Sequence, residues 1–90
     1  MQAEGSGAVF VIANPQAGGG RGSRHASVLA HQLQAVGVSC RLVQPVSAAD
    51  TVTATKAAVA AGARAVVACG GDGTVHAVVQ GLAHASVPMA

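Results

Sequence analysis

Apolar and polar residues alternate along the chain in blocks that predict strands and helices in regular succession. Three runs rich in Val and other apolar residues are typical of strands covered on both faces of a parallel sheet. These predicted strands span residues 8–13, 38–43 and 63–68. Segments with apolar residues at helical spacing follow the runs and predict helices over 24–36, 47–61 and 75–82. The order β-α-β-α-β-α predicts a parallel sheet joined by right-handed crossovers.

Single residues predict the ends and faces of the helices. Ser23 is the expected N-cap of the first helix, and Gly37 its end. Threonines lower the helix propensity of the second helix and make its start hard to place: Thr51, Thr53 and Thr55. In the third helix, spacing at i, i+3, i+4 and i+7 predicts one apolar face formed by Val75, Val78, Val79 and Leu82.

The two ends of the sequence bear on domain organisation. Residues 1–7 are small and polar and predict a flexible tail. Residues 86–90 have the composition of a connector that leads toward a fourth strand without reaching one. We therefore expect residues 8–90 to form the N-terminal part of a longer α/β protein. The expected fold is an incomplete three-layer arrangement, with helices on both faces of a mostly parallel sheet.

Composition and charge exclude several classes of protein. Apolar residues make up 51% of the 90-residue chain, but nearly half of them are Ala, so at most one small domain is expected. The net charge is +2 and the five basic residues form no run, which argues against nucleic-acid binding. The apolar stretches are too short for a transmembrane segment, and the N-terminus lacks the basic residues of a signal peptide. We expect a cytoplasmic protein in which Cys40 and Cys69 are buried free thiols.

Two glycine-rich segments, 14–22 and 70–74, each lie between a predicted strand and a predicted helix. On a parallel sheet both fall at the carboxyl ends of strands, where ligands bind. Glycine-loop N–H groups and the positive end of a helix suit phosphate. The spacing matches neither common nucleotide motif. The only lysine, Lys56, is far from both loops, and Ser23 or His76 takes the place of the third glycine of G-x-G-x-x-G.

Asp72 is the informative residue of the second segment. A carboxylate in a phosphate loop opposes the charge of its ligand, unless it binds a metal or accepts a proton from an attacking hydroxyl. Asp-Gly pairs also form turns and Asp caps helices, so a purely structural role is an equal alternative. Thr74 has the same two interpretations, as N-cap of the third helix or as a hydroxyl donor to a phosphate oxygen.

Together these segments resemble one known family. Asn14-Pro15 with the glycines of 18–22, and G-G-D-G-T at 70–74 followed by V-H-A-V-V-Q-G-L, resemble the diacylglycerol kinase catalytic domain. That superfamily includes bacterial lipid kinases and sphingosine and ceramide kinases, with NAD kinases as more distant relatives. The resemblance implies an ATP-dependent lipid kinase. Such an enzyme uses ATP and Mg²⁺ to phosphorylate a lipid hydroxyl of the diacylglycerol or sphingoid-base type.

The resemblance also implies roles for individual residues. Asp72 would lie at the reacting centre, as a base toward the lipid hydroxyl or within the Mg²⁺ and water network. The ATP phosphates would be held by Gly70, Gly71, Gly73 and Thr74. The nucleotide would be contacted by Asn14, Gly18, Gly19, Gly20, Arg21 and Gly22, with Arg21 as the phosphate counter-charge. The lipid would reach the site through a C-terminal domain absent from this sequence, in the cytoplasm or peripherally at the inner membrane surface.

Departures from the family pattern leave alternatives open. Many relatives have Glu at the position of Ala77 and a basic residue at that of Gly19. One alternative is an NAD kinase-like phosphotransferase, which acceptor preference would separate from a lipid kinase. The other is a non-catalytic nucleotide-binding module. Further family motifs would lie past Ala90, so we expect the fragment alone to be inactive, and an exposed sheet edge predicts self-association.

Overall fold

Six helices and strands alternate along the part of the chain that the structure describes. The structure is a computed structural model that describes residues 7–15 and 20–90. In chain order the elements are β1 (Val9–Ala13), α1 (Arg21–Ala35), β2 (Cys40–Val43), α2 (Ala48–Ala60), β3 (Ala65–Cys69) and α3 (Asp72–Gly81). The predicted order and types of element are confirmed, although α1 and α3 each begin three residues earlier than predicted.

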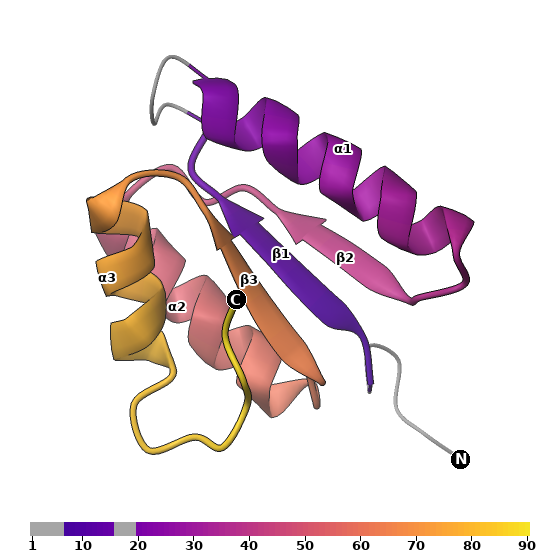
Figure 1. Cartoon of the computed structure of the whole chain (residues 1–90). Helices are drawn as coiled ribbons and strands as arrows, with labels where there is room; N and C mark the ends of the chain where they lie inside the picture. Colours follow the sequence, from indigo (N-terminus) through magenta and orange to yellow (C-terminus); the bar gives the residue numbers. More distant parts are fainter. Residues whose placement is uncertain (1–6, 16–19) are drawn as a thin grey trace.

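The strands form one parallel sheet with β1 at its centre, in the order β2-β1-β3. Val9 pairs with Cys40 on one side and with Ala65 on the other. The helix α1 covers one face of the sheet, while α2 and α3 lie together on the opposite face (Figure 1). The predicted three-layer α/β fold is therefore confirmed. No described helix is long and apolar enough to cross a membrane.

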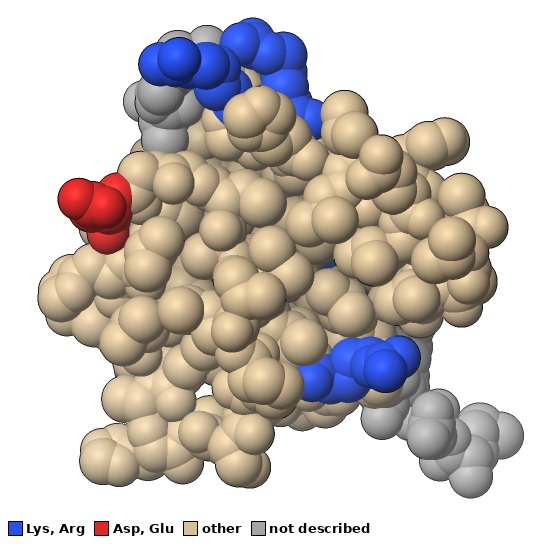
Figure 2. Space-filling model, in the orientation of Figure 1, with Lys and Arg blue, Asp and Glu red and all other residues tan. Residues whose placement is uncertain are grey.

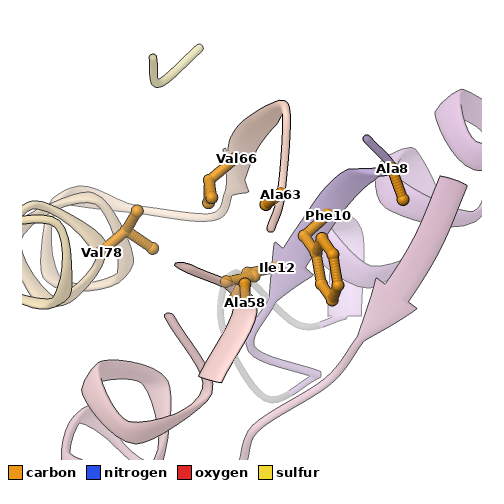
Figure 3. Close-up of a cluster of buried hydrophobic side chains, with 7 residues drawn as sticks. All are labelled: Ala8, Phe10, Ile12, Ala58, Ala63, Val66 and Val78. Carbon is orange, nitrogen blue, oxygen red and sulfur yellow. The ribbon is translucent and has the colours of Figure 1, made fainter. Parts of the chain in front are cut away.

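The strand β1 is buried along its whole length and supplies side chains to two separate cores. Val9, Val11 and Ala13 face α1 and pack with Ala26. Phe10 and Ile12 point to the other face, which alternation along a strand requires. There they join the larger cluster drawn in Figure 3, whose buried members are Ala8, Phe10, Ile12, Ala58, Ala63, Val66 and Val78.

The helices α2 and α3 approach each other closely because their facing residues are small. A Cβ on Gly81 would lie 2.5 Å from the Cβ of Thr55 and 3.0 Å from the carbonyl oxygen of Val52. Thr51 and Thr55 are buried on this side of α2. Their hydroxyls donate hydrogen bonds to the carbonyls of Ser47 and Thr51, each at 2.8 Å, so neither needs a partner across the interface.

The predicted apolar face of α3 is wrong in part. The buried stripe of the helix consists instead of Thr74, Ala77, Val78 and Gly81. Only Val78 belongs to both sets, and Val79 is 49% exposed. The close approach to α2 admits small side chains, so packing places Ala77 and Gly81 inward and turns the larger Val79 toward solvent.

The prediction that residues 86–90 only connect toward a fourth strand is also wrong in part. The last of these residues already pair with the edge of the sheet. The amide of Val66 donates to the carbonyl of Pro88 at 3.0 Å, and the amide of Ala90 donates to the carbonyl of Val66 at 2.9 Å. Met89 thus pairs in parallel with Val66. Residues 88–90 lie on the edge of β3 away from β1, and the sheet continues as β2-β1-β3 followed by this segment.

The Gly81 contact predicts that Gly81→Ala destabilises the fold. The added methyl would overlap Thr55, and overpacking of this kind costs about 1–3 kcal/mol. Urea denaturation of the chain measures the loss. Gly73→Ala is the matched control on the same helix, since a Cβ there meets nothing within 4 Å. Equal stability of the two variants would contradict the contact.

Candidate functional site

The two glycine-rich segments meet at the carboxyl edge of the sheet, between the neighbouring strands β1 and β3. The chain leaves β1 for α1 on one face and leaves β3 for α3 on the other. In an open α/β sheet this divergence is a topological switch point, and ligands bind in the crevice that it creates. The candidate site therefore lies where the sequence placed it, at the ends of these two strands.

The first turn of α1 rests directly on the backbone that leaves β3. A Cβ on Gly22 would lie 3.0 Å from the carbonyl oxygen of Cys69 and 3.2 Å from the Cα of Gly70. Gly22 is buried there, while Arg21 beside it is exposed. The two glycine-rich segments are therefore in contact. This contact explains why residue 22 is a glycine, since a side chain there would crowd the backbone after β3.

The start of α1 differs from the prediction. The N-cap is Gly20, in the left-handed region at φ 89°, and Ser23 lies within the first turn. The predicted Ser23 cap is wrong because glycine adopts this conformation readily and allows the helix to begin at Arg21. The Ser23 hydroxyl instead accepts a hydrogen bond from the Gln44 side chain, beyond the end of β2. Gly18 and Gly19 lie outside the described residues.

The start of α3 excludes the capping roles considered for Asp72 and Thr74. The N-cap is Gly71, which has an extended backbone, and the helix begins at Asp72. The Thr74 amide donates to the carbonyl of Gly71 at 3.0 Å, within the first turn. Thr74 is only 7% exposed and packs over Gly70, whose φ is 156° and where a Cβ would lie 2.6 Å from the threonine hydroxyl oxygen. Asp72 is exposed.

A cavity of about 220 Å³ lies at this edge of the sheet. Its lining comes from the end of β1 and from the first turns of α2 and α3: Asn14, Ala48, Thr51, Gly71, Gly73 and Thr74. Four of these residues were predicted to bind nucleotide. Ala48 and Thr51 were not, although the N-cap at Ser47 marks a helix that begins at this same edge. Two helix amino termini, each with its positive partial charge, therefore face one cavity.

A second hollow, open and about 620 Å³ in volume, lies on the outer face of α3. It is lined by Asp72, Gly73, Val75, His76 and Val79. Gly73 lines both spaces, so the first turn of α3 separates them. Asp72 faces the open hollow, and the smaller cavity is lined by uncharged residues.

Charged side chains are sparse around the site. Figure 2 shows basic side chains gathered over the amino-terminal end of α1, where Arg21 and Arg24 are exposed, and a largely uncharged surface elsewhere on that face. Within residues 7–15 and 20–90, no three His, Cys, Asp or Glu side chains gather as a metal site would require. A metal ion here would depend on Asp72 and on oxygens supplied by a ligand.

Both cysteines are free and partly buried. Cys69 is the last residue of β3 and Cys40 the first of β2, and both pack into the core beneath α1. Burial raises the pKa of each thiol above the ordinary value of 9.0 because it disfavours the charged thiolate. Neither thiol has the character of a reactive nucleophile.

The fold and the two glycine segments define an α/β domain with its candidate site at the switch point of a parallel sheet. A model of the diacylglycerol kinase catalytic domain matches residues 8–90. The chain belongs to this family, and the match indicates a lipid kinase-like function. A comparison with curated proteins gave no match.

The raised thiol pKa values predict a loss of stability in alkali. The unfolded chain releases its thiol protons near pH 9.0 and the folded chain only above it, so the free energy of unfolding falls as pH rises through this range. The chain has no Tyr and a single Lys, so the two thiols are the main contributors to the pH dependence of stability just above pH 9. Urea denaturation at a series of pH values measures the fall. A double variant, Cys40→Ala with Cys69→Ala, should lack most of it; an unchanged pH dependence would contradict this account.

Proposed function

We propose that this chain supplies the ATP-phosphate site of an ATP-dependent lipid kinase. The observation that carries the proposal is the 220 Å³ cavity. It is lined by Asn14 and Thr74, and the amino-terminal turns of α2 and α3 both contribute to its wall. Ligand sites for whole small molecules typically have about 300–1,000 Å³. A smaller, uncharged cavity with helix amino termini around it suits a phosphate group.

Packing explains some of the glycines of G-G-D-G-T but not all of them. A side chain at Gly70 would overlap Thr74, whereas a Cβ at Gly71 or Gly73 would meet nothing within 4 Å. Neither Gly71 nor Gly73 has a positive φ. Open space on both sides of Asp72 is what the close approach of a ligand requires, which favours a binding role for these two glycines.

In the proposed reaction the acceptor hydroxyl oxygen bonds to the γ-phosphorus of ATP. The bond from that phosphorus to the oxygen bridging to the β-phosphate breaks, and ADP leaves with the electron pair. Asp72 lines the open hollow next to Gly73, which lines both spaces, and its carboxylate can accept the hydroxyl proton there. Backbone amides at the start of α3 and the Thr74 hydroxyl orient the phosphates, and positioning of this kind supplies much of phosphoryl-transfer catalysis.

Asp72 also fits Mg²⁺, which binds through one or two carboxylates together with substrate phosphates. The ion neutralises phosphate charge. Asp72 would hold the ion directly or through water, and within residues 7–15 and 20–90 it is the one carboxylate that lines either space.

Ala77 does not weaken the proposal. It is 1% exposed, belongs to the buried stripe of α3 and lines neither of the two spaces at the site. In this proposal residues 8–90 form the N-terminal part of the ATP-binding domain, and a C-terminal domain completes the acceptor site.

The phosphate role predicts that Thr74→Val weakens Mg²⁺-ATP binding about tenfold or more, because a hydrogen bond to a charged oxygen is lost while side-chain shape is kept. Calorimetric titration with ATP measures the change. Thr53→Val is the matched control, an exposed threonine on α2. Equal affinities for the two variants would place the phosphates elsewhere.

The proton-acceptor role predicts that Asp72→Asn lowers the rate of lipid phosphorylation about 100-fold or more in the gene product that carries this chain. ATP affinity measured without Mg²⁺ should be kept or rise, because a charge that opposes the phosphates is removed. Asp50→Asn, at an exposed aspartate in the first turn of α2, is the control. Diacylglycerol, sphingosine and NAD are compared as acceptors. A rate within a fewfold of wild type would remove Asp72 from the reaction, and NAD as the preferred acceptor would overturn the lipid assignment.

A further inference from the structure

The outer face of α3 exposes apolar residues beside the candidate reacting carboxylate. Val75 and Val79 belong to the face that sequence spacing marks as apolar, yet packing against α2 uses a different stripe of the helix. Val79 is 49% exposed. Together with Asp72 and His76 these valines line the 620 Å³ hollow.

The hollow has Asp72 near one end and Val79 near the other, with Val75 and His76 between them along the helix. Asp72 begins the helix, and Val79 lies seven residues further along it, a rise of about 10 Å. Gly73 lines both this hollow and the 220 Å³ cavity that is proposed to hold the ATP phosphates. A hydroxyl group at Asp72 would therefore lie next to the phosphates, and the rest of its molecule could extend along Val75 and Val79.

Charge favours an alkyl chain over a dinucleotide as the occupant. Among the residues that the structure describes, Asp72 is the one carboxylate of the hollow and would repel a pyrophosphate, and neither Lys nor Arg lines the space. Beyond Asp72 the hollow is lined by Val75 and Val79 beside His76, and the valine side chains gain by the removal of apolar area from water.

We propose that the outer face of α3 binds the alkyl chain of the acceptor alcohol, with its hydroxyl at Asp72 and its chain over Val75 and Val79. This inference rests on the proposed function and names the acceptor side of the same site. It makes Val79 a specificity-determining residue for acceptors with apolar chains.

The test is Val79→Asp in the gene product that carries this chain, assayed with Mg²⁺-ATP and dioctanoylglycerol. The expected result is a KM for dioctanoylglycerol at least tenfold higher, with an unchanged KM for ATP. Val28→Asp is the matched control, because Val28 is 57% exposed on α1, across the sheet from the hollow. It should leave both KM values unchanged.

A second measurement uses the unmodified protein and so does not depend on the folding of a variant. Dioctanoylglycerol with a photoreactive diazirine at the end of one chain should label the α3 peptide that contains residues 75–79. Labelling confined to other peptides would overturn the inference, as would equal KM values for Val79→Asp and Val28→Asp. A change of oligomeric state in Val79→Asp with an unchanged acceptor KM would also overturn it, and would identify the face as a contact between copies.

These failures differ from failure of the proposed function. If the wild-type protein phosphorylates diacylglycerol and only the Val79 and labelling results are negative, the chain-binding face alone is wrong. If the wild-type protein binds no ATP and phosphorylates no lipid, the proposed function and this inference both fall.

Discussion

The contact between Gly81 of α3 and Thr55 of α2 sets the geometry on which the candidate site depends. The cavity at the carboxyl edge of the sheet has Thr51 of α2 on one wall and Thr74 of α3 on another, so its width follows the distance between these helices. That distance is short because Gly81 has no side chain. The hydroxyls of Thr51 and Thr55 donate hydrogen bonds within their own helix, so their burial in the interface leaves neither of them unsatisfied.

The electrostatics of the site come from the backbone more than from side chains. Uncharged residues line the cavity, and the first turns of α2 and α3 both contribute to it. Each helix amino terminus carries about half a positive charge. A net charge of +2 with scattered basic residues is therefore compatible with a phosphate site, because the attraction depends on how helices are oriented.

The sequence predicted the fold class, the order of elements and the edge of the sheet at which the site lies, because glycine runs after buried strands are strong local signals. It did not predict the cap at Gly20, the helical position of Asp72 or the inward face of α3, which depend on tertiary packing. Ala48 and Thr51 reach the cavity only through the placement of α2. Spacing on α3 marks Val75 and Val79 as apolar, but only the position of α2 decides that Ala77 and Gly81 turn inward instead.

The glycines of G-G-D-G-T differ in whether protein packing requires them. This difference helps to explain how the start of α3 could lie next to both ATP and the acceptor. Gly70 is required by the protein itself, since a side chain there would displace Thr74. Gly71 and Gly73 face open space on either side of Asp72, so protein packing does not demand their lack of side chains. A larger residue at Gly73 would stand between the 220 Å³ cavity and the hollow on α3, both of which this glycine lines. In-line transfer requires donor phosphate and acceptor oxygen to come within contact distance of each other. In the proposed function, glycine at this position leaves room between donor and acceptor, because it adds no side chain where the two spaces adjoin.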